Sequence, residues 1–210
     1  MIRLLIADDH AIVRRGVRDI LSEMPEQIDI TEVSSVKDAL KEITNNSYDI
    51  AILDISFPDG NGLDILKQVS GIRPNTRILF LSMYPEEQYA RRALKNGAYG
   101  YLTKDSAPTE LIAAIHKVIN GSKYVTITLA ERLVEDLAVP RTKEPHELLS
   151  DREFQVMLAL AWGKKTTDIA KELMLSPKTV STYRARIMQK LNLLTTSELI
   201  RYVMERGLGK

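Results

Sequence analysis

The sequence predicts a doubly wound α/β sheet followed by a small all-α domain, and three observations carry this prediction. Residues 1–120 alternate five short apolar runs with five segments of helical period, the pattern of parallel strands joined by helices. From residue 150 onward the pattern is entirely helical. A polar stretch around 140–147 with two prolines separates these parts. A chain of 210 residues has room for two small domains of this kind.

The five apolar runs are the predicted strands. They span residues 2–7, 28–33, 50–53, 77–81 and 99–102. The first, third and fourth are almost continuously apolar, as strands buried on both faces of a sheet are. The helical segments lie near 11–21, 35–45, 62–70, 86–95 and 108–120. We expect the common strand order 2-1-3-4-5, in which ligands bind beyond the carboxyl ends of the strands.

Residues 121–147 are expected to link the two domains, which then span 1–120 and 148–210. Within this linker a connecting helix is predicted over 128–138, where leucine recurs at every fourth position. The remainder is polar and rich in proline, as linkers often are.

The C-terminal domain carries the signals of four helices. Ser150 followed by Glu153 is a capping box that opens the first helix. Thr167 opens a short second helix. Ser176, followed by a proline, is the N-cap of a longer third helix that runs to about residue 191. A last helix is expected over 196–206.

Charge is distributed unevenly along the chain. The formal net charge is only +1, yet residues 148–210 carry 11 basic and 6 acidic side chains. This excess indicates a polyanionic partner for the C-terminal domain alone. The absence of cysteine excludes disulfides and thiolate metal sites. No apolar run approaches the roughly 18 residues that cross a membrane, and the first residues lack a signal peptide's apolar core, so we expect a soluble cytoplasmic protein.

Acidic side chains follow two strands that should be neighbours. Asp8 and Asp9 come directly after the first strand and Asp54 ends the third, so their carboxylates should converge at one sheet edge. Ser82 and Lys104 follow the fourth and fifth strands to the same edge. Three adjacent carboxylates repel one another unless a cation offsets them, and a hard ion with oxygen ligands, Mg²⁺, suits them. A carboxylate facing Mg²⁺ and a lysine favours phosphoryl transfer; the alternative is a set of solvated acids at strand ends.

These residues, together with Pro58-Asp59-Gly60-Asn61-Gly62, resemble the receiver domain of two-component response regulators, which has a flavodoxin-like fold. The resemblance implies that Asp54 accepts a phosphoryl group from a sensor histidine kinase. It implies that Lys104 contacts this group and that Ser82 and Tyr101 form a switch pair. The implied Mg²⁺ ligands are Asp8, Asp9, Asp54 and the backbone carbonyl of Ser56. We expect His10 to be a neighbour of the site without a catalytic role.

The short and long helices over 165–191 have the size and spacing of a helix-turn-helix motif. Val180, Ile187 and Leu191 form the apolar stripe of the longer helix, and the rest of its surface holds no acid. A helix face without carboxylates can approach phosphates without repulsion and can hydrogen-bond to bases. The alternative is an ordinary solvated helix.

This domain resembles the LuxR-type DNA-binding domain through Leu149–Glu153, Ile169-Ala170, Lys178–Val180 and Lys190-Leu191. The family places the longer helix in the major groove of double-stranded DNA. Ser181, Thr182 and Ala185 would then face bases. The residues implied to contact mostly phosphates are Lys178, Thr179, Tyr183, Arg184, Arg186 and Lys190.

Together the two resemblances match the NarL/FixJ class of response regulators. They imply a phosphorylation-dependent transcription factor that forms a homodimer on promoter DNA. We expect the receiver to obstruct this pairing until it is phosphorylated; the alternative is a dimer driven by the receiver, with no closed state. One rival is a phosphatase with an aspartyl nucleophile, which usually has a second acid two residues after the nucleophile; here that residue is Ser56. Another is a phosphate-independent dimerisation module, which the intact set of acids and Lys104 disfavours.

Overall fold

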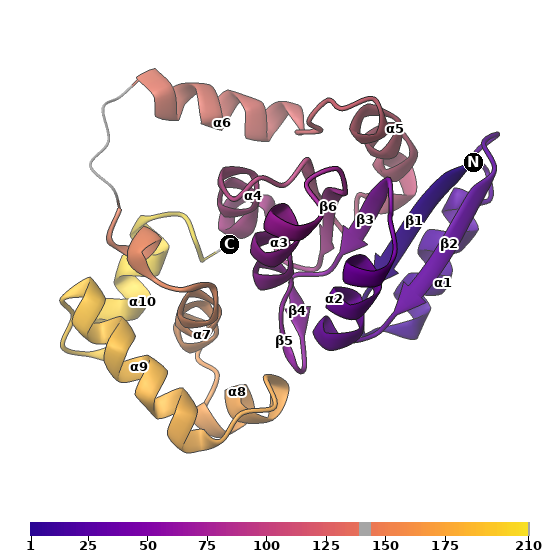
Figure 1. Ribbon diagram of the computed structural model, residues 1–210. Coiled ribbons are helices and arrows are strands. Elements are labelled where there is room, and N and C mark those ends of the chain that lie inside the picture. The colour runs from indigo at the N-terminus through magenta and orange to yellow at the C-terminus, as the bar shows by residue number, and fades with distance from the viewer. Residues whose placement is uncertain (139–143, 210) are drawn as a thin grey trace. The chain divides into compact units, whose positions relative to one another are not determined.

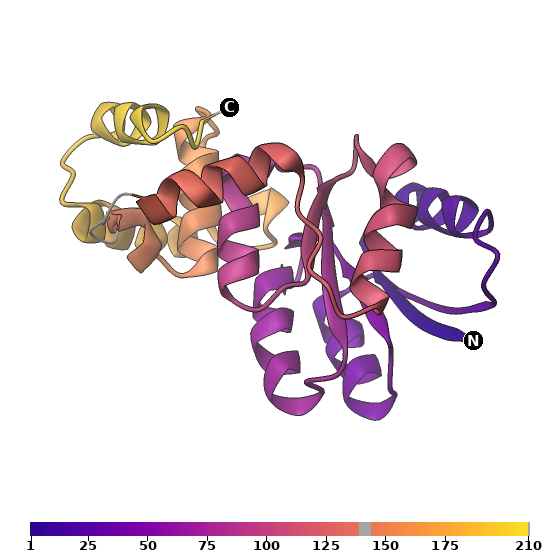
Figure 2. The same cartoon turned by 90° about the horizontal axis from the view of Figure 1, so that it is seen from above.

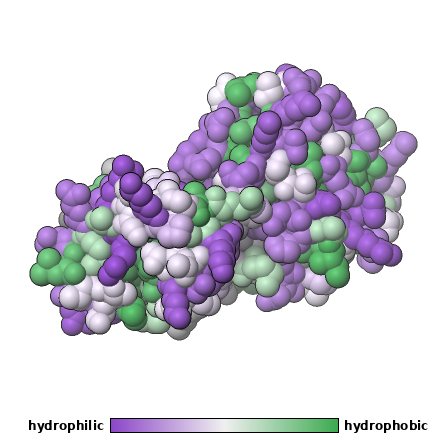
Figure 3. Space-filling view, turned by 90° about the horizontal axis from the view of Figure 1, so that it is seen from below, coloured by the Kyte–Doolittle hydropathy of each residue, from purple (hydrophilic) through white to green (hydrophobic). Residues whose placement is uncertain are grey.

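The computed structural model describes residues 1–138 and 144–209, which divide into two compact units, Met1–Ala130 and Glu131–Lys210 (Figure 1). The predicted linker residues 139–143 lie outside the described part of the chain. Among the described residues, no helix combines the length and the apolarity needed to cross a membrane. Hydrophilic residues cover most of the face shown in Figure 3, and hydrophobic ones form scattered patches, as expected when most apolar side chains are internal.

The first unit is built on a five-stranded parallel sheet of order β2-β1-β3-β6-β7, which confirms the predicted order. Its strands are β1 (Ile2–Ala7), β2 (Ile28–Val33), β3 (Ile50–Leu53), β6 (Arg77–Ser82) and β7 (Gly100–Thr103). The last two end one residue later than predicted, because Ser82 and Thr103 still pair in the ladder. The central strand β3 is buried throughout, in keeping with its apolar sequence.

Helices cover both faces of this sheet (Figure 2). They are α1 (Ala11–Leu21), α2 (Val36–Asn45), α3 (Gly62–Ile72), α4 (Glu86–Lys95) and α5 (Ala107–Ile119). Helices α1 and α5 pack against each other on one face, and α2 packs against α3 on the other. Each lies within two residues of its predicted range. The sheet and helices enclose an aliphatic core that includes Leu4, Ile52 and Leu111.

A small hairpin of β4 (Ser56–Phe57) and β5 (Gly60–Asn61) follows β3. Its Asp59 carboxylate accepts hydrogen bonds from the first two backbone amides of α2, at 3.0 and 3.1 Å, so it caps a helix from a distant loop. Gly62 lies against the backbone oxygen of Asp54, with no room for a Cβ atom. The hairpin is thereby held close to the end of β3.

The first unit continues past residue 120, the expected domain boundary. The Tyr124 amide donates to the Tyr99 carbonyl at 2.7 Å, and Tyr124 forms a parallel bridge with Gly100. The Thr126 hydroxyl donates to Glu86 at 2.7 Å. The start of the predicted linker thus attaches to β7 and α4, before α6 (Ile127–Ala138) forms the connecting helix.

The second unit is helical, as predicted. After the 3₁₀ helix η1 (Pro145–Leu148) come α7 (Asp151–Ala161), α8 (Thr166–Glu172), α9 (Pro177–Leu191) and α10 (Thr196–Glu205). Ser150 and Glu153 form the predicted capping box. Helix α8 begins one residue before the predicted Thr167. The predicted apolar stripe of α9 is buried at Val180, Ile187 and Leu191.

Candidate functional site

Asp8, Asp54 and Lys104 meet at the carboxyl edge of the sheet, as the strand order predicts. Asp8 follows β1 and Asp54 follows β3, and both are almost fully buried. The Lys104 ammonium donates to Asp54 Oδ2 at 2.7 Å and lies at the same distance, 2.7 Å, from Asp8 Oδ2. Asp54 Oδ1 accepts the amides of Ile55 at 2.6 Å and Ser56 at 3.4 Å. One lysine therefore bridges two buried carboxylates.

Burial and charge act in opposite directions on this cluster. Burial raises the pKa of Asp54, and the neighbouring Lys104 ammonium lowers it in part. Burial alone would lower the pKa of Lys104, but the carboxylates of Asp54 and Asp8 outweigh it and raise this pKa. The lysine is therefore protonated at neutral pH and supplies a fixed positive charge.

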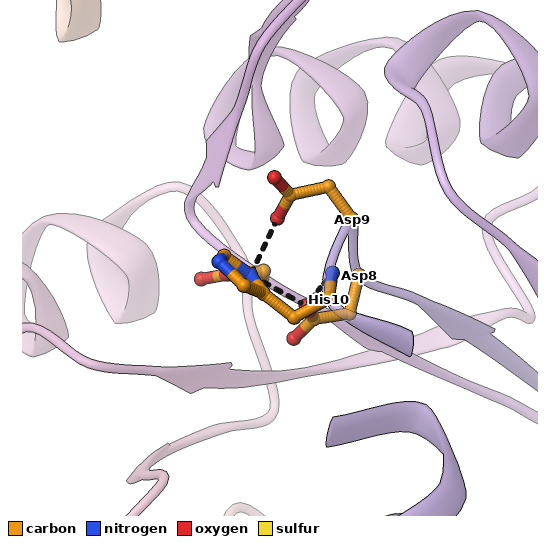
Figure 4. Close-up of side chains that lie close together, drawn as sticks. Asp8, Asp9 and His10 are labelled. Atoms are coloured by element: carbon orange, nitrogen blue, oxygen red, sulfur yellow. Dashed lines mark hydrogen bonds and ion pairs between the residues drawn. The ribbon is translucent and has the colours of Figure 1, made fainter. Parts of the chain in front are cut away.

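The turn formed by Asp8, Asp9 and His10 adds the carboxylate of Asp9 to this cluster (Figure 4). The His10 amide donates to Asp8 Oδ1 at 2.8 Å, and His10 Nδ1 lies 2.8 Å from Asp9 Oδ1. Despite this proximity, the buried Asp9 Oδ1 accepts no hydrogen bond within the described residues. Ligand atoms of Asp8, Asp9, His10 and Asp54 all lie within 4.8 Å of one another. The carboxylates of Asp8, Asp9 and Asp54 make this an oxygen-rich group, which fits a hard divalent cation.

Ser82 and Tyr101 lie on the neighbouring strands β6 and β7, and both are fully buried. The Tyr101 hydroxyl donates to the Tyr84 carbonyl at 2.7 Å, and the Ser82 hydroxyl accepts the Tyr84 amide at 3.4 Å. Burial raises the pKa of Tyr101 far above its usual value, so its phenol is neutral. Both members of the expected switch pair thus contact the residue that follows β6 by two positions.

The exposed face of α9 carries the predicted polar and basic residues. Lys178, Ser181, Thr182, Arg184, Ala185 and Arg186 are exposed, and Thr179 and Tyr183 are partly buried. The hydroxyls of Ser181 and Thr182 donate to carbonyls one turn earlier, at 2.9 and 3.0 Å, which leaves their oxygen lone pairs available. Arg184 Nη2 donates to the Thr196 hydroxyl at 2.8 Å.

The family of the chain is decided by two matches that together span both units. Residues 4–116 match the response regulator receiver domain, and residues 147–203 match the bacterial regulatory proteins of the luxR family. The chain belongs to the response regulators. Its function is that of a DNA-binding transcriptional regulator in a two-component system, as predicted, and not that of an enzyme.

Relatives extend the match over nearly the whole response regulator. This chain is 34% identical to the response regulator UvrY of Escherichia coli, over 99% of this chain and 96% of that protein. It resembles RcsB from Salmonella enterica serovar Typhimurium bound to promoter rprA in the presence of phosphomimetic BeF₃⁻, with TM-score 0.62, 27% identity, and coverage of 97% of this chain and 99% of that one. A structure of two RcsB dimers bound to two parallel DNAs matches with TM-score 0.60 and 28% identity, over 97% and 98% of the respective chains.

Within the LuxR-type domain, Lys190 lies differently from the other basic residues of α9. Its ammonium donates to Glu153 Oε2 at 2.6 Å, and the Glu153 side chain is buried. Glu153 also accepts the Ser150 amide in the capping box, at 2.8 Å. Lys190 therefore joins the end of α9 to the start of α7 through an ion pair within the domain, although its own side chain stays 40% exposed.

Two contacts near the receiver site were not predicted from the sequence: that of Arg14 with Asp8, and the capping of α2 by Asp59, a residue named only as part of the turn. Arg14 donates from Nη1 to the Asp8 carbonyl at 2.7 Å, and Asp59 caps α2 from the hairpin. An arginine one turn into a helix reads as a surface residue, so the sequence contains no signal for Arg14. The acidic residue in the Pro-Asp-Gly turn is typical of a turn and conceals its second role as a cap.

Proposed function

We propose that Asp54 is the phosphoacceptor of this response regulator and that a sensor histidine kinase is the donor. A carboxylate oxygen of Asp54 attacks the phosphorus, the O–P bond forms, and the P–N bond to the kinase histidine breaks with the electron pair leaving on that nitrogen. The observation that carries this assignment is the Lys104 ammonium, 2.7 Å from both Asp54 and Asp8. A fixed cation beside the nucleophile can stabilise the charge on the transferred oxygens.

Mg²⁺ is the proposed cofactor, held by Asp8, Asp9, Asp54 and the backbone carbonyl of Ser56. When bound, it would offset the charge of the carboxylates and of the phosphoryl oxygens. Support comes from the three carboxylates of Asp8, Asp9 and Asp54, whose oxygens lie within 4.8 Å of one another. His10 is proposed to orient the acidic turn through its amide, without taking part in proton transfer.

Ser82 and Tyr101 are the proposed switch pair. The Ser82 hydroxyl would turn toward the phosphoryl group and give up its contact with the Tyr84 amide. The buried Tyr101, whose hydroxyl donates to the Tyr84 carbonyl, would hold the β6–α4 loop in the conformation that the rotated Ser82 hydroxyl permits. Phosphorylation then shifts an existing equilibrium of the loop by as much as the phosphoryl group favours one state.

For DNA, we propose that α9 lies in the major groove of a promoter. Ser181, Thr182 and Ala185 face bases, and the proposed phosphate contacts are Lys178, Thr179, Tyr183, Arg184 and Arg186. Because Lys190 is engaged with Glu153, we assign it to support of the helix and no longer to phosphate contact. The proposed active form is a homodimer in the cytoplasm, where the chain contacts both the kinase and the promoter DNA.

Phosphotransfer tests the proposal directly. The purified chain is incubated with acetyl phosphate and Mg²⁺, and the label is mapped by mass spectrometry. We expect one acid-stable, base-labile phosphate on Asp54, absent in Asp54→Ala and after chelation. The exposed Asp105→Ala serves as the matched control and should label normally. Undiminished labelling of Asp54→Ala would overturn the assignment.

A further inference from the structure

Arg14 on α1 joins two parts of the receiver domain through one guanidinium group. Nη1 donates to the Asp8 carbonyl at 2.7 Å, and Nε donates to Glu32 Oε2 on β2 at 3.1 Å. The Arg14 side chain is only 18% exposed. The contact with the Asp8 carbonyl is part-buried and the contact with Glu32 is exposed, so the contact with the turn is the better sheltered from water.

These contacts hold the turn that carries the acidic residues. The Asp8 carbonyl belongs to the peptide that precedes Asp9, so fixing its direction also fixes where the Asp9 side chain starts. The Arg14 backbone amide donates to the His10 carbonyl at 3.2 Å. One residue thus contacts both ends of the turn, by its backbone at His10 and by its guanidinium at Asp8.

We infer that Arg14 is a positioning residue for the Mg²⁺ site, which rests on the function proposed above. Mg²⁺ demands nearly ideal octahedral geometry, so a small displacement of one carboxylate weakens binding. Groups that orient metal ligands without touching the metal typically change affinity by about 10–100-fold when they are lost. Arg14 acts in this way through the Asp8–Asp9 peptide.

Charge alone makes the opposite prediction. A guanidinium near the acidic cluster repels a second cation, so its removal would strengthen Mg²⁺ binding if electrostatics were its only effect. Arg14→Lys keeps the charge but cannot reach Asp8 and Glu32 with two separate nitrogens. Arg14→Gln removes both the charge and the two-point contact. Comparison of the two variants therefore separates positioning from charge.

Arg18 provides a matched control on the same helix. Its Nη1 lies 3.2 Å from Glu32 Oε1, so it pairs with the same carboxylate as Arg14. Its side chain is 53% exposed, and among the described residues it forms no hydrogen bond or ion pair with the acidic turn. Arg18→Lys and Arg18→Gln repeat the chemical changes without disturbing that turn.

The test titrates the full chain and each variant with MgCl₂ alone and follows the backbone amide NMR shifts of residues 8–10. For Arg14→Lys we expect the Mg²⁺ midpoint to rise about tenfold. Both Arg18 variants should keep the wild-type midpoint. Labelling of Arg14→Lys by acetyl phosphate should recover at saturating Mg²⁺, because the nucleophile Asp54 is untouched.

An unchanged Mg²⁺ midpoint in Arg14→Lys would overturn the inference. If the midpoint fell in Arg14→Gln and stayed at the wild-type value in Arg14→Lys, Arg14 would act through its charge only. If Arg14→Lys does not fold by circular dichroism, Glu32→Gln decides: it loosens the anchor of Arg14, and a midpoint equal to wild type would overturn the inference. Failure of wild-type Asp54 to label would instead refute the proposed function, whatever the Arg14 variants do.

Discussion

Lys104 provides the positive charge between two buried carboxylates, and its replacement by Met should destabilise the receiver domain. Loss of one partner from a buried ion cluster costs about 3 kcal/mol, because the remaining charges are left uncompensated. The ammonium also lies where it opposes a second cation on Asp8 and Asp54. Lys104→Met should therefore bind Mg²⁺ more tightly, and Mg²⁺ should raise its unfolding temperature more than that of wild type.

Thermal unfolding followed by circular dichroism, at several Mg²⁺ concentrations, measures both effects. Exposed Lys123→Met is the control and should match wild type. A Lys104→Met chain as stable as wild type without Mg²⁺ would contradict the expected charge balance.

Glu153 should make the stability of the LuxR-type domain dependent on acid pH. Burial would raise the pKa of Glu153, but hydrogen bonds from Lys190 and from the Ser150 amide outweigh it and lower this pKa below its usual 4.5. A carboxyl with a lowered pKa in the folded state stabilises the fold above its unfolded pKa. This stabilisation is lost as the pH falls below about 4.5 and through the folded pKa.

Trp162, the single tryptophan, lies at the end of α7 and reports unfolding of this domain by its fluorescence. Between pH 6 and pH 3, we expect wild type to lose more stability than Glu153→Gln. At pH 7, Lys190→Met should cost about 2 kcal/mol through loss of the same charged hydrogen bond. Parallel pH profiles for wild type and Glu153→Gln would refute this role of the pair.

At the scale of the element, α9 has two kinds of basic residue, and DNA binding should separate them. Lys178 is exposed and forms no ion pair within the part of the chain that the structure describes, whereas Lys190 pairs with Glu153. Each lost phosphate contact flattens the salt dependence of affinity by roughly one unit. Lys178→Ala should show this change at every sequence, and Lys190→Met should leave the slope unchanged below its unfolding temperature. Fluorescence anisotropy with labelled duplex DNA at several salt concentrations measures the slopes; a flattened slope for Lys190→Met alone would reverse the assignment.

Thr182 belongs to the same element but should act on sequence preference. Its hydroxyl is exposed and donates within the helix, so its oxygen remains able to accept from a base. We expect Thr182→Val to change the ranking of selected duplex sequences while nonspecific affinity stays within about twofold. Selection from a random duplex library compares the two proteins, and an identical ranking would place Thr182 outside the base contacts.

At the scale of the whole molecule, phosphorylation should act through association of two chains. One helix-turn-helix domain covers little DNA and binds weakly, whereas two linked copies on adjacent half-sites gain from effective concentration. Beryllofluoride should shift the full chain from monomer to dimer in analytical ultracentrifugation and tighten DNA binding. With Asp54→Ala, beryllofluoride should cause neither dimerisation nor tighter DNA binding. A wild-type chain that stays monomeric with beryllofluoride, yet binds DNA more tightly, would show that dimerisation is not the switch.

Local sequence patterns were enough to predict the strands of the sheet and the helix caps of Ser150 and Ser176. The strand order was expected as the common one for such sheets, and with it the edge at which Asp8, Asp54 and Lys104 meet. This succeeds because hydrophobic period and capping are local properties, and parallel strands bring their carboxyl ends to one edge. The individual roles of these residues in phosphotransfer and of the α9 residues on DNA stay predictions.

Only the tertiary structure decided which charged side chains meet away from that edge. Arg14 contacts Asp8 and Glu32, Lys190 pairs with Glu153 across 37 positions of sequence, and Tyr124 joins the sheet beside Gly100. A lysine on a helix surface has the same sequence signature whether it reaches solvent, DNA or a neighbouring helix. Its partner depends on how two distant elements pack and on the few ångströms that separate them, and neither is encoded in the local pattern.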